Sequence, residues 1–245
     1  KGRGYKKAVF FDRQYGYVHF FATSDGKMKA NLERTDYLPD FGKSWNADLE
    51  RSNLIWVIIR HRLQVTRLPM KGQTIRLETW PMPTTRTAYP RSTIAYDENG
   101  NECFRSISLW ILMDAGSRAM VLPGKSGVEV AGLLRGCELQ APSSLIPKDM
   151  ASVQTRTVRY TDLDINGHMN NCRYLDWIVD TLPSEFHQDH APREFSVCYH
   201  AEAREKDVID LSWALNEEGC LGDAFRNEAS PSAGQSRVFS ARMLF

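Results

Sequence analysis

The chain has 245 residues, of which 42% are hydrophobic and 25% charged, and its formal net charge is +1. This composition is typical of a folded globular protein, and the near-neutral charge gives no overall attraction to nucleic acid or to an anionic membrane. The longest apolar run, 54–59, has the length of a strand and falls far short of the ~20 residues that span a bilayer. The length allows one large domain or two of ordinary size.

The cysteines argue against a disulfide framework and against a zinc site, because their number is odd and none has C-x-x-C spacing. They are Cys103, Cys137, Cys172, Cys198 and Cys220. The N-terminus is basic but lacks the apolar core of a signal peptide. We therefore expect a cytoplasmic protein, although the absence of an initiator methionine leaves a removed targeting segment open.

The first half predicts a strand, a helix and then several strands. Aromatic and β-branched residues predict a strand over 8–24, apolar spacing predicts a helix over 28–38 that ends at Pro39, and a shorter helical piece follows at 45–53. Further strands are expected at 54–68 and 74–80. A hairpin is expected over 92–113, turning at Asn99-Gly100, a dipeptide favoured by type I′ turns.

The second half repeats this order after a stretch rich in turn formers. The pattern predicts a helix over 170–182 and strands over 195–204, 208–213, 222–229 and 236–245. The repetition favours two copies of one α+β unit, each with a helix covered by its own antiparallel sheet. We expect an N-terminal unit at 1–123, a connector at 124–150 and a C-terminal unit at 151–245.

The segment DLDINGH between the predicted strand and helix of the second half imitates the opening of a calcium loop. Asp162, Asp164, Asn166 and Gly167 match the first positions of that motif. The twelfth position must supply a bidentate carboxylate, and here it is Arg173. A calcium site is therefore not expected, and no other metal or cofactor is indicated.

The same segment carries groups that suit acid/base chemistry. Asp164 or Asn166 can simply cap the following helix. His168, however, places a titratable ring at the positive end of that helix. A carbonyl oxygen bound there would meet backbone N–H groups, the Asn166 amide and the His168 ring, which together can stabilise developing negative charge.

A second carboxylate lies in the predicted strand 195–204. Alternation places Glu202 on one face with Cys198 and His200. A glutamate in a strand fit for burial is unusual, since unpaired buried carboxylates are costly. The plainer interpretation is a solvated glutamate on an edge strand.

These residues resemble a known family. DLDINGHMNNCRYLDW is similar to the D-L-D-x-N-x-H-x-N-N-x-x-Y-x-x-W segment of acyl-acyl-carrier-protein thioesterases, and YHAEA is similar to their Y-R-R-E-C segment. The resemblance implies a tandem hot-dog fold and the release of fatty acids from acyl carrier protein. It also implies that Asp164, Asn166, His168 and Glu202 form the catalytic group, and that the pantetheine thioester enters between the halves with the acyl chain against the first.

Two departures from the family pattern bear on mechanism. Ala203 replaces the cysteine of the plant enzymes, so no thiolate can attack from that position. His200 and Ala201 replace two arginines. A water activated by a carboxylate remains, with Asn166 and His168 polarising the thioester carbonyl, and either Asp164 or Glu202 is a candidate for the general base.

Other nucleophile and metal interpretations are weaker. Cys172 falls on the apolar face of the predicted helix, where a buried thiol is inert, and Cys198 shares a face with Glu202. His187 and His190 have ligand-like spacing but no third ligand beside them.

The partner implied by the resemblance is an acidic acyl carrier protein, which requires a local basic surface. The candidates are Arg60, Arg62, Arg67 and Lys71 around one predicted strand, and Arg156, Arg159 and Arg173 around the DLDINGH segment, which lies nearer the chemistry. Rival functions are an acyl-CoA thioesterase, a non-catalytic acyl-thioester sensor and a hot-dog dehydratase. Quaternary state stays open between a monomer and a homodimer, because two fused units already act as a pseudo-dimer.

Overall fold

A computed structural model describes most of the chain from residue 52 onwards. The described residues are 52–69, 74–130, 132–134, 139–145, 150, 152–164, 167–217, 219–227, 230–231 and 236–245. The predicted strand at 8–24, the predicted helix at 28–38 and nearly all of the helical piece at 45–53 lie outside them. Within the described residues, no helix has the length and apolar character needed to cross a bilayer.

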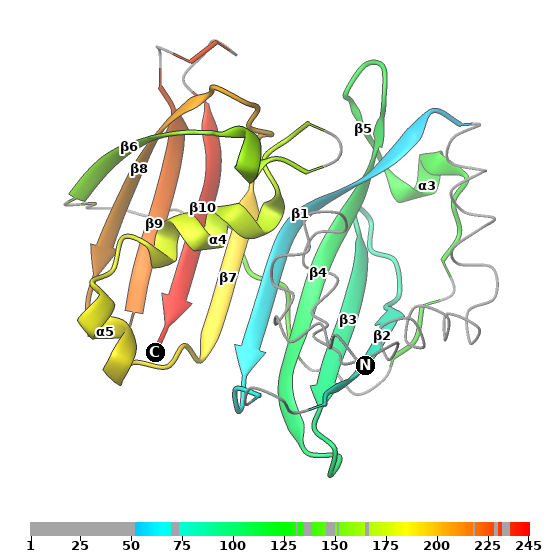
Figure 1. Ribbon diagram of the computed structural model, residues 1–245. Coiled ribbons are helices and arrows are strands. Elements are labelled where there is room, and N and C mark those ends of the chain that lie inside the picture. Colours follow the sequence, from blue (N-terminus) through cyan, green and yellow to red (C-terminus); the bar gives the residue numbers. More distant parts are fainter. Residues whose placement is uncertain are drawn as a thin grey trace, which may run out of the picture. The chain divides into compact units, whose positions relative to one another are not determined.

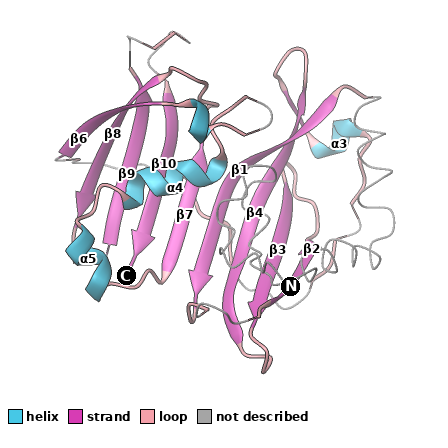
Figure 2. Ribbon diagram, in the orientation of Figure 1, coloured by secondary structure: helices cyan, strands magenta, loops and turns pink. Residues whose placement is uncertain are grey.

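Far more of the described residues lie in strands than in helices, and the helices of this part are short (Figure 2). The first elements are β1 (Leu54–Val65), β2 (Arg76–Pro81), β3 (Tyr89–Tyr96), β4 (Glu102–Asp114), β5 (Met120–Val121) and α3 (Pro123–Ser126). The later elements are β6 (Ser152–Thr157), η3 (Tyr160–Asp162), α4 (Asn171–Val179), α5 (Ser184–Asp189), β7 (Glu194–Tyr199), β8 (Val208–Leu215), β9 (Gly219–Arg226) and β10 (Arg237–Leu244).

The chain forms two compact units, and β1 contributes to both of them. Its first half joins Thr66–Ala141, and its second half, Arg60–Val65, joins Pro142–Phe245. In the first unit β2, β3, β4 and β1 lie in that order, with β5 paired to β4. The β2–β3, β3–β4 and β4–β5 pairs are antiparallel.

The predicted hairpin between β3 and β4 is present, but its turn is not of type I′. Such a turn needs positive φ at both central residues, and here only Gly100 has it, at 84°. The Asp97 carboxylate fixes the loop by accepting the N–H groups of Asn99 and Asn101 at 2.9 and 2.8 Å. These side-chain contacts make the turn, so the Asn-Gly pair predicted the hairpin and not its geometry.

The second unit is a sheet in the order β1, β7, β10, β9, β8 and β6, with α4 running across one face of its strands (Figure 1). All neighbouring pairs in this sequence of strands are antiparallel as well. The strand β7 lies between β1 and β10, so it is a central strand. The strand that was expected to carry Glu202 is therefore not an edge strand.

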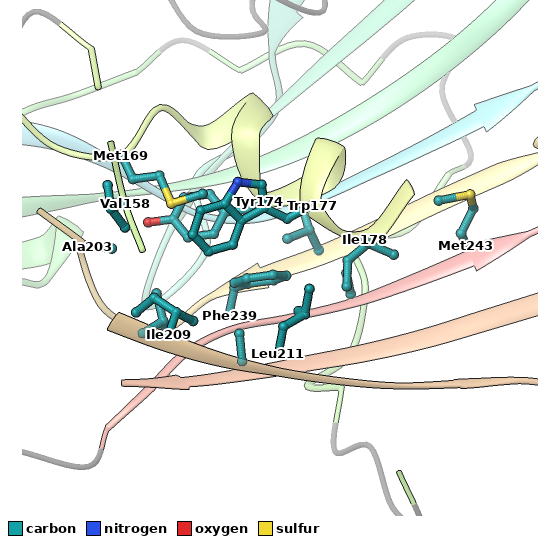
Figure 3. Close-up of a cluster of buried hydrophobic side chains, with 14 of the residues drawn as sticks. Val158, Met169, Tyr174, Trp177, Ile178, Ala203, Ile209, Leu211, Phe239 and Met243 are labelled. Atoms are coloured by element: carbon teal, nitrogen blue, oxygen red, sulfur yellow. The ribbon is translucent and has the colours of Figure 1, made fainter. Parts of the chain in front are cut away.

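The core of the second unit forms where α4 packs on the sheet. Tyr174, Trp177 and Ile178 of the helix lie over Leu211 and Phe239 of the strands (Figure 3). Tyr174 and Trp177 are both buried. Their phenol and indole groups have polar atoms, yet their rings carry most of the buried surface.

A glycine on β9 allows the helix to approach this closely. A Cβ atom added at Gly222 would lie 2.0 Å from Cδ1 of Ile178, which is far below van der Waals contact. Ile178 is itself fully buried. The helix position, and with it the position of Tyr174, therefore depends on the missing side chain at Gly222.

Three predicted elements of the second half have bounds that differ by three residues or more from those expected. The strand β9 spans Gly219–Arg226 and not 222–229. The helix ends at Val179 instead of residue 182, and a second short helix, α5, follows Pro183. The strand β7 ends at Tyr199, so Glu202 lies in the loop after the strand and not within it. The alternation used to assign the face of Glu202 therefore stops before reaching it.

Candidate active site

The DLDINGH segment forms a tight loop whose two ends pair with each other. Leu163 and Met169 form an antiparallel bridge, and the Asp164 N–H donates to the His168 carbonyl at 2.8 Å. The Asp164 carboxylate accepts the His168 N–H at 3.2 Å. Gly167 has a φ of 73°, the left-handed conformation that glycine adopts without strain.

The loop that follows β7 lies directly against this segment. The Met169 N–H donates to the Ala203 carbonyl at 2.7 Å, and His168 forms an antiparallel bridge with Arg204. As a result Nε2 of His168 lies 3.3 Å from Oε2 of Glu202. The two side chains are 24% and 33% exposed, so both can reach a bound substrate and water.

Of the four predicted catalytic residues, the structure therefore brings His168 and Glu202 together. Asp164 adjoins them through the backbone of His168. Asn166 lies outside the described residues. Burial raises the pKa of the Tyr174 phenol, and the negative charges of Glu202 and Asp164 raise it further.

The start of α4 differs from the expectation in a way that affects the chemistry. The helix is capped by Asn170, whose side chain accepts the Cys172 N–H at 3.0 Å, and not by Asp164 or Asn166. The Asn170 N–H is also used, since it donates to the Asp162 carbonyl at 2.8 Å. The expected free backbone donors are therefore not available at Met169, Asn170 and Cys172.

The sequence analysis did not predict Tyr174 as a residue of the site, because an aromatic side chain on one face of a helix usually belongs to the hydrophobic core. Its hydroxyl group accepts the backbone N–H of Ala203, and the ring packs edge-on against Phe239 at a centroid distance of 4.9 Å. Figure 3 shows Tyr174 between the helix and the segment that carries Ala203. Tyr174 is also the matched tyrosine of the D-L-D-x-N-x-H-x-N-N-x-x-Y-x-x-W segment, and this match is the signal by which the sequence could have indicated it.

The alternative nucleophiles are poorly placed. Cys172 and Cys198 are both buried, and the Cys198 thiol donates to the Ser143 carbonyl at 3.6 Å. The imidazoles of His187 and His190 each lie within hydrogen-bond distance of a backbone carbonyl, at 3.1 and 2.9 Å. His190 also stacks on Phe186, which places these histidines in the packing around α5.

Most of the predicted basic residues already have partners. Arg62 pairs with Glu194, Arg67 pairs with Asp97, and Arg60 donates to the Pro142 carbonyl, while Lys71 lies outside the described residues.

Near the site, Arg156 pairs with Asp180 and Arg173 pairs with Asp176. Arg159 is exposed. Two further exposed cations, Arg204 and Lys206, flank the loop that carries Glu202, and the sequence analysis did not include them.

Two family models match the chain. The acyl-ACP thioesterase N-terminal domain matches residues 34–122, and the acyl-ACP thioesterase C-terminal domain matches residues 146–236. An acyl-[acyl-carrier-protein] hydrolase of Cuphea viscosissima is 25% identical over 199 residues, which cover 77% of this chain and 48% of the relative. A dodecanoyl-[acyl-carrier-protein] hydrolase of Cinnamomum camphora is 28% identical over 196 residues, covering 74% and 50%. Both relatives are chloroplastic, and the chain spans about half the length of each.

Solved structures show the same fold. An acyl-ACP thioesterase from Bacteroides thetaiotaomicron superposes with a TM-score of 0.75 at 23% identity, covering 97% of this chain and 93% of that one. The 12:0-ACP thioesterase of Umbellularia californica gives a TM-score of 0.69 at 23% identity, covering 88% and 85%. The predicted tandem hot-dog fold of class α+β is confirmed. Because the two family models together match most of the sequence, the chain belongs to the acyl-ACP thioesterase family.

Proposed function

We propose that this protein hydrolyses fatty acyl-ACP thioesters to free fatty acid and acyl carrier protein. The observation that carries the proposal is the pair formed by His168 and Glu202, whose side chains meet at 3.3 Å and remain partly exposed. A carboxylate and an imidazole at this distance can orient a water and a carbonyl group without a thiol nucleophile. The family to which the chain belongs supplies the substrate class.

The contacts favour Glu202 over Asp164 as the general base. One oxygen of Asp164 accepts the His168 N–H and so helps to hold the loop. The Glu202 carboxylate lies 3.3 Å from the His168 ring and its side chain is 33% exposed, so it can take a proton from water that enters the site. In this scheme His168 and Asn166 polarise the thioester carbonyl, which develops negative charge during attack.

Acyl carrier protein is the proposed partner, and the exposed cations around the site are its proposed docking surface. Arg159, Arg204 and Lys206 are all exposed near the loop of Glu202. Arg156 and Arg173 fit this role less well, because each is already neutralised by an aspartate of α4 or the residue that follows it. An acidic carrier protein should therefore bind more weakly as salt is raised.

The catalytic roles are tested with two isosteric variants and one control. Glu202→Gln should lower kcat on acyl-ACP by about 10²- to 10⁴-fold, the range that a placed general base contributes. Asp164→Asn should lower it less, because the amide oxygen still accepts the His168 N–H. Cys198→Ser, which changes a buried thiol, should keep most of the activity. Unchanged rates in both carboxylate variants would contradict the proposed chemistry.

The remaining features are proposals as well. We infer a division into units at 1–123 and 151–245 with a connector at 124–150. In the described part of 127–150 the chain forms no helix or strand. A cytoplasmic location and the choice between monomer and homodimer stay predictions, and sedimentation of the purified protein measures the second of these.

A further inference from the structure

We propose that Asp207 and Arg226 are positioning residues that fix Glu202 opposite His168. The inference rests on the proposed function, because it assigns these two residues a role in the same site. No strand ladder holds Glu202, since β7 ends at Tyr199. Some other set of contacts must therefore decide where its carboxylate lies.

Asp207 makes the most deeply buried of these contacts. Its side chain is 0% exposed, and an unpaired carboxylate in such a place would be costly. One oxygen, Oδ2, accepts the Arg204 N–H at 3.0 Å and lies 3.4 Å from Nε of Arg226. The other oxygen accepts the Ser230 hydroxyl at 2.7 Å. Asp207 thus holds the backbone two residues after Glu202.

Arg226, at the end of β9, holds the backbone of Glu202 itself. Its Nη2 donates to the Glu202 carbonyl oxygen at 2.5 Å, and its Nη1 donates to the Ser236 hydroxyl at 2.9 Å. The side chain is 11% exposed. Because the same guanidinium also pairs with Asp207, the two residues act as one unit that holds the chain on both sides of Ala203.

The opposite side of residues 202–204 is held by the DLDINGH segment and by α4. Met169 donates its N–H to the Ala203 carbonyl, and the Ala203 N–H donates to the Tyr174 hydroxyl. Backbone groups of Glu202, Ala203 and Arg204 are therefore all bound to fixed partners. The direction of the Glu202 side chain follows from these contacts.

A small displacement of this segment would affect catalysis more than folding. Glu202 has a 3.3 Å contact with His168 and is partly open to solvent, so losing that contact alone costs little stability. A misplacement of about 1 Å at a reacting group can cost about 100-fold in rate. Loosening the Asp207–Arg226 unit should therefore lower kcat before it unfolds the protein.

The test compares Asp207→Asn and Arg226→Lys with a matched control, Asp210→Asn. The control makes the same chemical change on β8, where Asp210 accepts from Thr155 and Asn227 and does not touch the Glu202 segment. Each of the first two variants should lower kcat on acyl-ACP by about 10- to 100-fold with little change in KM. The control should keep the rate of the wild type.

Making the same change in a Glu202→Gln variant distinguishes a positioning role from a general loss of structure. In Glu202→Gln, the further change Asp207→Asn should cause no additional loss of kcat, because the group that it positions is already disabled. An equal loss in both backgrounds, or a loss of the same size in Asp210→Asn, would overturn the proposal.

Amide hydrogen exchange tests the same inference without any activity. Asp207→Asn should speed exchange at Ala203 and Arg204 while amides of β10 keep their protection. Unchanged exchange in the 202–204 segment would overturn the proposal. If the wild type releases no fatty acid, the proposed function fails and this measurement still decides the positioning.

Discussion

The packing of α4 on its sheet can be tested by adding one methyl group at Gly222. In Gly222→Ala the new Cβ would lie 2.0 Å from Cδ1 and 3.1 Å from Cγ1 of Ile178, whereas carbon atoms in contact are ~3.5–4.0 Å apart. Ile178 is fully buried and cannot swing into solvent, so either its Cδ1 turns to another rotamer inside the packed core or the helix and the strand shift apart. Overpacking of this kind costs about 1–3 kcal/mol of the free energy of unfolding.

Urea unfolding of three variants checks this reasoning. Ile178→Val removes the clashing Cδ1 and by itself should cost about 0.5–1.5 kcal/mol. The double variant should be more stable than the sum of the two single changes predicts, by about 0.5–3 kcal/mol, because the new methyl group then occupies the vacated space. Gly124→Ala is the control, since its added Cβ meets nothing within 4 Å. Wild-type stability in Gly222→Ala, or strict additivity in the double variant, would refute the close approach of the helix.

Three further predictions concern buried groups that take no part in the proposed hydrolysis. Burial lowers the pKa of His61 to about 3, so between pH 6.5 and that value the unfolded chain binds a proton that the folded chain does not. Stability should therefore fall as pH drops through this window, by at most about 5 kcal/mol, and urea titrations of a His61→Gln variant should show a shallower decline. Burial raises the pKa of the Cys220 thiol to about 11, so iodoacetamide at pH 8 should label it only after unfolding; rapid labelling of the native protein, read by mass spectrometry, would contradict this. Asn170→Ala removes the cap of α4 and should cost about 1 kcal/mol of the free energy of unfolding, and a thermal midpoint equal to that of the wild type would contradict the capping geometry.

The strands of the second unit could be predicted well because their residues alternate between a core and an outer face. The expected strands at 208–213 and 236–245 correspond closely to β8 and β10. Their ends were harder to place. The apolar and small residues of YHAEA continue the alternation of β7 beyond Tyr199, although the backbone there turns away to meet the DLDINGH segment. Nothing in local sequence marks a point at which tertiary contacts override the pattern.

Only the residues of the site that lie in recognisable sequence motifs could be predicted. His168 stood out as a titratable ring before a helix and Glu202 as a carboxylate in a largely apolar segment. The family resemblance assigned both to one site, and the structure brings their side chains together. Asp207 and Arg226 gave no comparable signal, since a lone aspartate after a lysine and a lone arginine at a strand end usually belong to a solvated surface. Only the fold shows that the pair is buried and bound to the backbone of the Glu202 segment.

The most direct test of the proposed function is the release of free fatty acid by the purified protein from matched acyl-ACP and acyl-CoA substrates with short, medium and long acyl chains. We expect rapid release from acyl-ACP, a clear preference for one range of chain lengths, and a loss of that activity in Glu202→Gln. Faster release from acyl-CoA would instead identify a CoA thioesterase. Tight binding of acyl-ACP without release would contradict hydrolysis and identify the pair formed by His168 and Glu202 as part of a binding site.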